Sequence, residues 1–217
     1  MCKKRQRISM IGIGMGSRES MTIEAAEAVR NCDCMIGAQR MILAARDVRY
    51  GTGVKEEMSE QPEPSVPELC EYNADEIAAY IDEHPEFTHV AVLLSGDTGF
   101  YSGAKKLSEI FASYPERYEV ELIPGISSVV YLAARLKTTW EDGKLVSLHG
   151  QAENILQTVN RNYKTFLLLG GKETGERMID RLKDYGMDEV TVYIGSRLSY
   201  PDEQIICGHP GDLSGRE

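Results

Sequence analysis

The chain has 217 residues and a formal charge of −10 at neutral pH, with acidic residues in excess in both halves. This length suits one large domain or two modest ones, and the acidity excludes the broad basic surface of a non-specific nucleic-acid binder. No apolar run reaches the length of a membrane span, and the five cysteines have neither metal-ligand nor disulfide spacing. We therefore expect no metal site, no membrane segment, no nucleic-acid partner and a cytoplasmic location.

The apolar run at 8–11 predicts a first strand, and the sequence Gly-Ile-Gly-Met-Gly at 12–16 predicts a glycine loop after it. Residues 20–29 follow with apolar side chains at helical spacing. Ser20 or Thr22 is the expected N-cap of this helix, because a short side-chain oxygen satisfies free N–H groups in the first turn.

A second strand is expected at 32–36, where Cys32 and Cys34 point to opposite faces as small core side chains. A dinucleotide site is not supported here. The third glycine of that fingerprint is replaced by Ser17, and the strand ends in Gly37 where a ribose-binding acid belongs.

The next segment alternates between helical and irregular patterns. A short helix is expected after residue 40, then an acidic, proline-bearing solvated connection over 51–67. Residues 69–83 return to helical periodicity, which Pro85 ends.

A Val- and Leu-rich run at 90–94 predicts a buried parallel strand, followed by the loop Ser-Gly-Asp-Thr-Gly at 95–99 and a helix over 99–113. Such loops lie at the carboxyl ends of strands, where open α/β sheets bind ligands. The loop glycines allow close approach of a ligand, and Asp97 either caps the helix or accepts hydrogen bonds from the ligand. An ordinary capped turn is equally compatible with this pattern.

A strand at 118–123 leads into Pro-Gly-Ile-Ser-Ser at 124–128, which predicts a hinge whose serines cap a helix at 129–136. We therefore expect two α/β domains, residues 1–117 and 118–217.

The second half repeats the α/β rhythm. Strands are expected at 144–148, 165–169 and 190–194, with a helix at 173–185 and a turn into a last strand at 197–205. His149 ends the first of these strands in a glycine loop, where a structural role and a substrate contact are both open.

Glycine loops follow several strands, but no P-loop, zinc-protease or nucleophile-elbow motif is present and no acid–base pair stands out. This pattern suits an enzyme whose cofactor is itself the activated reagent. Methyl transfer from S-adenosylmethionine is such a reaction, since orientation alone contributes up to ~7–11 kcal/mol.

The residues at 12–16, 22–26, 95–101 and 124–128 resemble the successive motifs of the tetrapyrrole methylase family. The sequences at 147–150 and 198–203 narrow the resemblance to the branch that methylates a corrinoid precursor at C5 in cobalamin biosynthesis. Two departures are Met15 and Thr98, which stand where the family often has proline.

The resemblance implies a two-domain α/β fold, S-adenosylmethionine in the cleft between the domains, and a homodimer. It also implies a final strand beyond residue 217. The residues expected to contact the cofactor are Met15, Ser95, Gly96, Asp97, Phe100, Ser127, Ser128, Leu169 and Leu198.

The implied substrate is a corrinoid tetrapyrrole, with no catalytic group assigned. The residues expected near it are Gly14, Tyr101, His149, Arg40 and Arg135, with Lys137 and Lys172 as further cations for its carboxylates. A solvated surface charge is the alternative for each cation.

Alternative functions are methylation of another tetrapyrrole position, of RNA or of diphthamide, and non-catalytic ligand binding. The C15 methylation and decarboxylation of fused relatives would belong to a separate protein.

Overall fold

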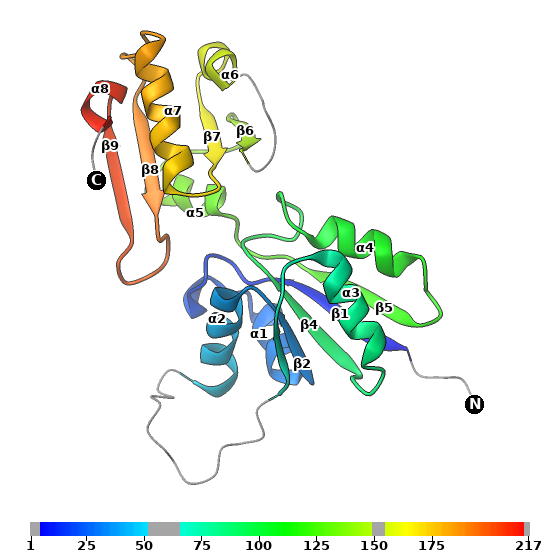
Figure 1. Ribbon diagram of the computed structural model, residues 1–217. Coiled ribbons are helices and arrows are strands. Elements are labelled where there is room, and N and C mark those ends of the chain that lie inside the picture. The colour runs from blue at the N-terminus through cyan, green and yellow to red at the C-terminus, as the bar shows by residue number, and fades with distance from the viewer. Residues whose placement is uncertain (1–4, 52–65, 149–154, 215–217) are drawn as a thin grey trace. The chain divides into compact units, whose positions relative to one another are not determined.

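The computed structural model describes residues 5–51, 66–148 and 155–214 and divides into two compact units, Met1–Ser128 and Val129–Glu217 (Figure 1). Strand β5 (Tyr118–Ile123) pairs with β1 (Gln6–Gly12), so it completes the sheet of the first unit. The domain boundary expected between residues 117 and 118 is therefore too early, because it would separate two hydrogen-bonded strands.

The first unit contains a five-stranded sheet in the order β3-β2-β4-β1-β5, and every neighbouring pair is parallel. The remaining strands are β2 (Cys34–Gly37), β3 (Glu68–Cys70) and β4 (His89–Leu94). Because all five strands run the same way, the loops after β1, β2, β4 and β5 meet at one edge of the sheet.

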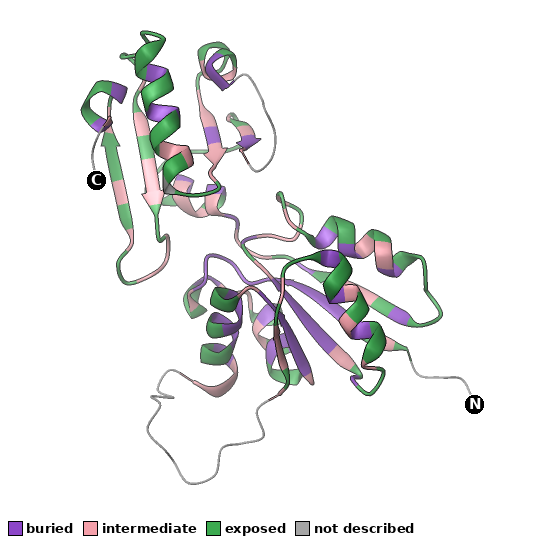
Figure 2. Cartoon of the chain, viewed as in Figure 1, coloured by how far each residue is buried: buried purple, intermediate pink, exposed green. Residues whose placement is uncertain are grey.

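Helices cover both faces of this sheet (Figure 1). Ile11 and Ala91 pack with α1 (Ile23–Asn31) and α2 (Gln39–Tyr50). The alternate residues Met10 and Val92 pack with α3 (Ala74–Glu83) and α4 (Ala104–Ala112). Burial on both faces explains the continuous apolar runs in these strands, which Figure 2 shows as buried ribbons between the helices.

Most element types in the first unit agree with the sequence analysis, but several starting points differ. Thr22 caps α1, its Oγ1 accepting from Ala25 N at 3.1 Å, as predicted, after a short 3-10 turn η1 (Arg18–Ser20). The helix expected over 69–83 is wrong at its start: β3 comes first, and Asn73 then caps α3 by accepting from Asp75 N at 2.9 Å.

The second strand begins at Cys34, and Cys32 instead ends α1. Both thiols are buried, in the core clusters on opposite faces of the sheet, so the prediction that they are core side chains on different faces is confirmed.

The second unit contains two separate strand pairs. Strand β6 (Lys144–Ser147) is parallel to β7 (Thr165–Leu168), and β8 (Val192–Ser196) is antiparallel to β9 (Gln204–Gly208). Its helices are α5 (Ser128–Arg135), α6 (Ile155–Arg161), α7 (Lys172–Asp184) and α8 (Pro210–Leu213), of which α6 and α8 were not predicted.

A small apolar core centred on Val146, Ile155 and Met178 joins β6, β7, β8, α6 and α7. None of the helices in the described parts of the chain has the length and apolarity needed to cross a lipid bilayer.

Candidate functional site

The carboxyl edge of the first sheet is built on direct backbone contact between three strand ends. A Cβ on Gly125 would lie 2.2 Å from the carbonyl oxygen of Gly96 and 2.3 Å from that of Gly12. No larger residue fits this approach, since backbone atoms cannot move aside as a flexible side chain does. We call Gly12, Gly96 and Gly125 the glycine edge.

A backbone bridge adds to this contact. Gly14 N donates to Gly96 O at 3.1 Å, and Gly96 N donates to Gly14 O at 2.8 Å. Both glycines have φ of +70°, the left-handed region that favours glycine. Ser20 fixes the same loop, accepting from Met15 N at 3.2 Å and donating to Ser17 O at 2.9 Å.

Three of the residues expected to contact the cofactor converge on the glycine edge. The position of a Cβ on Gly96 lies 3.6 Å from Met15 Cε and 3.6 Å from Ser127 Cα. Met15 and Ser127 are both buried, although they come from the loops after β1 and β5. The structure thus brings together residues that are far apart in the sequence.

Asp97 joins two of these loops. Its Oδ1 accepts from Gly99 N at 2.8 Å, and its Oδ2 accepts from Gly125 N at 3.1 Å. It does not cap α4, whose N-cap position is Gly103. The helix starts at Ala104 and not at 99: Asp97 holds Gly99 N in a turn before the helix, and Ser102 Oγ accepts from Ala104 N, the first residue of the helix.

The outer part of this loop is exposed and contacts one of the expected substrate cations, Arg40. Ser95 Oγ accepts from Arg40 Nη2 at 2.7 Å, which brings the first turn of α2 to the end of β4. Phe100 lies edge-on to Tyr101 with ring centroids 4.9 Å apart. Tyr101 is 56% exposed and has φ of +47°, an unusual conformation for an aromatic residue that is enriched at functional sites.

The second unit holds the other expected residues. Leu198 folds over Gly195, where a Cβ would lie 2.9 Å from Leu198 Cδ2, and Leu169 lies similarly 3.1 Å from the Cβ position of Gly175. Arg135 is paired with Glu203, its Nε donating to Oε1 at 2.7 Å. The proposed contacts of Leu169 and Leu198 with the cofactor stay predictions.

The remaining candidates are less informative. Ser128 is the first residue of α5 and Lys172 the first of α7, while Lys137 is exposed with φ of +54°. His149 lies outside the described residues.

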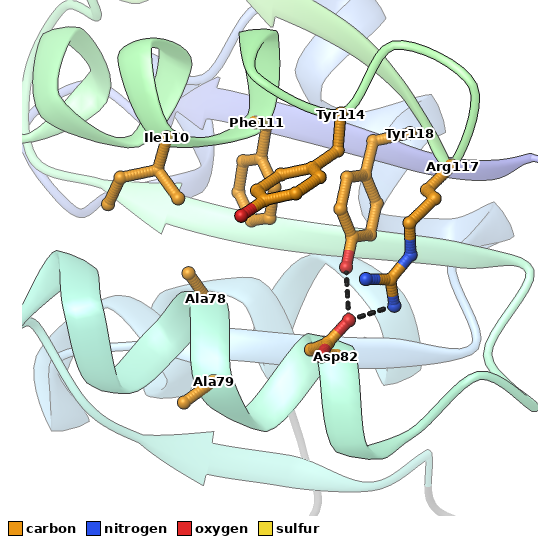
Figure 3. Close-up of a pocket in the computed structure, with 8 residues that line it drawn as sticks. All are labelled: Ala78, Ala79, Asp82, Ile110, Phe111, Tyr114, Arg117 and Tyr118. Atoms are coloured by element: carbon orange, nitrogen blue, oxygen red, sulfur yellow. Dashed lines mark hydrogen bonds and ion pairs between the residues drawn. The ribbon is translucent and has the colours of Figure 1, made fainter.

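A cavity of about 210 Å³ lies between α3 and α4, and three of its polar side chains bond to one another (Figure 3). Tyr118 Oη donates to Asp82 Oδ1 at 2.8 Å, and the Arg117 guanidinium forms an ion pair with the same oxygen. Burial, and then the bond to Asp82, raises the pKa of Tyr118 to about 12, so the phenol stays a donor. Because Tyr118 pairs with Gln6 at the amino ends of β5 and β1, this cavity lies at the sheet edge opposite the glycine edge.

The sequence model of the family Tetrapyrrole (Corrin/Porphyrin) Methylases matches residues 7–213 of this chain. The chain belongs to this family. A probable cobalt-precorrin-7 C(5)-methyltransferase of Methanocaldococcus jannaschii is 29% identical over 204 residues, 91% of this chain and 87% of that protein.

Solved tetrapyrrole methylases share the fold. A cobalamin biosynthesis precorrin-6Y methylase from Archaeoglobus fulgidus aligns with a TM-score of 0.63 at 20% identity, covering 98% of this chain and 93% of that one. A uroporphyrin-III C-methyltransferase from Thermus thermophilus, solved with S-adenosylhomocysteine, aligns with a TM-score of 0.67 at 17% identity, covering 96% and 85%. The expected α/β tetrapyrrole methylase fold is confirmed.

Sequence reasoning on this tetrapyrrole methylase missed residues that shape the site without being exposed in it. Gly12 and Gly125 were assigned only to turns, although their contact sets the spacing of the strand ends. Glu203 was quoted only within a motif. An acid directly after a Pro-Asp turn was the available signal, but its side-chain partners Tyr131 and Arg135 are distant in the sequence.

Proposed function

We propose that this tetrapyrrole methylase transfers a methyl group from S-adenosylmethionine to C5 of cobalt-precorrin-7, giving cobalt-precorrin-8 in cobalamin biosynthesis. The convergence of Met15 and Ser127 on Gly96, in a chain of this family, is the observation that carries the proposal. The Methanocaldococcus and Archaeoglobus relatives, named for the C(5) and precorrin-6Y reactions, support the choice of substrate.

The residues at the glycine edge fit the cofactor. The position beside Gly96 is lined by Met15 and Ser127, and a Cβ on Gly99 would meet only Asp97 Oδ1 within 4 Å. Backbone without side chains lets a ligand approach closely. We infer that Met15, Ser95, Gly96, Phe100 and Ser127 hold the cofactor, with Ser128, Leu169 and Leu198 as further contacts. When bound, its sulfonium supplies an electrophilic methyl group.

The protein's own contribution is to fix positions before the ligands arrive. Both carboxylate oxygens of Asp97 accept hydrogen bonds from backbone N–H groups. We therefore propose that Asp97 fixes the loops after β4 and β5 and does not contact the cofactor. This corresponds to the orientation effect that suits an activated reagent.

We propose that Arg40 binds a carboxylate of the corrinoid. Ser95 holds its guanidinium at the end of β4, and the remaining donors of the exposed fork are suited to a carboxylate. Gly14 and Tyr101 lie in the neighbouring loops and are proposed as substrate contacts with it. Arg135 is the weaker candidate, because Glu203 already neutralises its charge.

We further propose that the chain acts as a homodimer in the cytoplasm, beside a separate protein for C15 methylation and decarboxylation. The cysteines in the described residues are free thiols, which suits a reducing compartment. Light scattering on the purified protein tests the dimer, and a molar mass of one chain would contradict it.

The test is turnover of cobalt-precorrin-7 with S-adenosylmethionine labelled in its methyl carbon. We expect a mass gain of one methyl group and an NMR signal from a labelled methyl on C5. Label on another carbon would assign the enzyme to a different tetrapyrrole position. Cofactor binding without transfer would contradict the proposed substrate.

A further inference from the structure

The loop 197–203 of the second unit has a constrained backbone. It consists of two successive turns, with Tyr200 N donating to Arg197 O at 3.0 Å and Glu203 N donating to Tyr200 O at 3.0 Å. Arg197 has φ of +48° and Ser199 has φ of +71°, so two residues with side chains are left-handed. Such residues persist only where their surroundings hold them.

The Glu203 carboxylate fixes this backbone conformation. Its Oε2 accepts from Ser199 N at 2.7 Å and from Tyr131 Oη at 2.8 Å, while its Oε1 accepts from Arg135 Nε at 2.7 Å. Its side chain is only 15% exposed. One carboxylate therefore ties the left-handed Ser199 to two residues of α5.

These donors also keep Glu203 ionised. The Ser199 N–H, and then the Tyr131 hydroxyl, hold the pKa of its carboxyl below the usual value. The negative charge that orders the loop is thus present throughout the neutral range.

Leu198 lies between the two left-handed residues and points at the gap left by Gly195. A Cβ there would lie 2.9 Å from Leu198 Cδ2 and 3.0 Å from Leu132 Cδ1 of α5. The Leu198 side chain therefore lies at the same place as a side chain of α5, the helix that Glu203 binds.

Ser199 carries an unusual hydroxyl. Within the described residues its Oγ is buried and has no hydrogen-bond partner. Buried polar groups are nearly always satisfied, and a bound polar group is one partner that would satisfy this hydroxyl.

We propose that Glu203 is a positioning residue for the cofactor, holding the loop 197–203 so that it presents Leu198 and Ser199 to S-adenosylmethionine. This rests on the proposed function, in which Leu198 contacts the cofactor. Arg135 then serves the loop through Glu203 and does not bind the substrate.

The test compares Glu203→Gln with Glu173→Gln, which removes an exposed ion pair to Arg177 in the same unit. Hydrogen exchange of the segment 196–203 is measured without ligand, and the affinity for S-adenosylhomocysteine by calorimetry. We expect Glu203→Gln to speed exchange at Leu198 and Ser199 and to weaken binding by about tenfold, the effect of a lost charge-assisted hydrogen bond. Glu173→Gln should do neither.

The Michaelis constants separate positioning from substrate binding. In Glu203→Gln we expect the KM for S-adenosylmethionine to rise and the KM for the corrinoid to stay within about twofold, less than a lost hydrogen bond would cost. A raised corrinoid KM with unchanged cofactor affinity would overturn the proposal, because it would indicate that Arg135 binds the substrate.

A second variant and two further outcomes complete the test. Tyr131→Phe removes one donor and should give a smaller change of the same kind, so the proposal survives a Glu203 variant that does not fold. If the unmodified protein binds S-adenosylhomocysteine but methylates no cobalt-precorrin-7, the proposed function fails while the binding comparison still decides the role of Glu203. Faster exchange with unchanged cofactor affinity would also overturn the proposal.

Discussion

The glycine edge of the first unit and the loop 197–203 of the second are held in different ways. The glycine edge depends on main-chain atoms in contact, with no space for a Cβ at Gly12 or Gly125. The loop depends on side chains, with Glu203 as the common acceptor. A backbone contact fails when any side chain is added, whereas a side-chain network fails when one acceptor is changed.

The largest effect should come from breaking the backbone contact with Gly125→Ala. The new methyl would meet two carbonyl oxygens at 2.2 and 2.3 Å, so the strand ends must separate. We expect a loss of about 3 kcal/mol or more in the free energy of unfolding, at the upper end for overpacking, measured by urea denaturation.

Gly103→Ala is the matched control for that variant. Gly103 has φ of −66°, and its Cβ position has only Leu94 Cδ2 nearby, at 3.8 Å. Alanine there should be neutral or stabilise by about 0.4–1 kcal/mol through the unfolded chain. Equal stability of the two variants would contradict the close contact at Gly125.

Asp97→Asn tests a side chain on which the glycine edge depends. An amide leaves one of the two N–H groups, of Gly99 or Gly125, without its acceptor. We expect a loss of about 1–3 kcal/mol in stability and weaker binding of S-adenosylhomocysteine by calorimetry.

Asp33→Asn separates these two effects. Asp33 also accepts from backbone N–H groups, those of Thr88 at 2.8 Å and His89 at 3.1 Å, but at the opposite edge of the sheet. It should lower stability and leave the affinity for S-adenosylhomocysteine unchanged. If both variants weaken binding equally, the Asp97 effect is not local to the site.

Gly195→Ala asks whether the side-chain-held loop tolerates an added methyl better than the glycine edge. The atoms that a Cβ would meet are the flexible ends of Leu198 and Leu132, which can rotate away. We expect a cost of about 1 kcal/mol, the low end for overpacking, with weaker cofactor binding because Leu198 moves. A loss as large as that of Gly125→Ala would remove the distinction between the two regions.

The smallest effect concerns pH at the amino edge of the first sheet. Burial, chiefly, holds the pKa of His89 below its usual value of 6.5, and its Nε2 lies 2.7 Å from Ser9 Oγ in a buried position. The nearby charges are Arg7, which lowers the pKa, and Asp33 and Glu121, which raise it. The unfolded chain therefore binds the proton more readily, and stability is lost as the pH falls through about 6.5.

His89→Gln should remove this dependence, because an amide does not titrate. Urea denaturation at pH 7 and pH 5 should show a smaller loss for His89→Gln than for the unmodified protein. Parallel losses would mean that other groups carry the acid sensitivity.

Local pattern was sufficient for much of the first unit. The apolar runs that became β1 and β4 and the cap at Thr22 follow from burial and from hydrogen bonding within a few residues. The ends of the helices and strands were harder to predict from the sequence. Helix α3 starts only at Ala74, because the pairing of β3 with β2 overrides the helical spacing of the residues before it.

The sequence by itself determined the family, the parallel α/β class and the glycine loops after the strands, since these depend on composition and short-range order. Only the tertiary structure decided that Asp97 accepts a hydrogen bond from Gly125 N and that Arg135 pairs with Glu203. Each of those contacts joins residues that are distant in the chain, and their partners are chosen by which strand ends and helix faces the fold brings together.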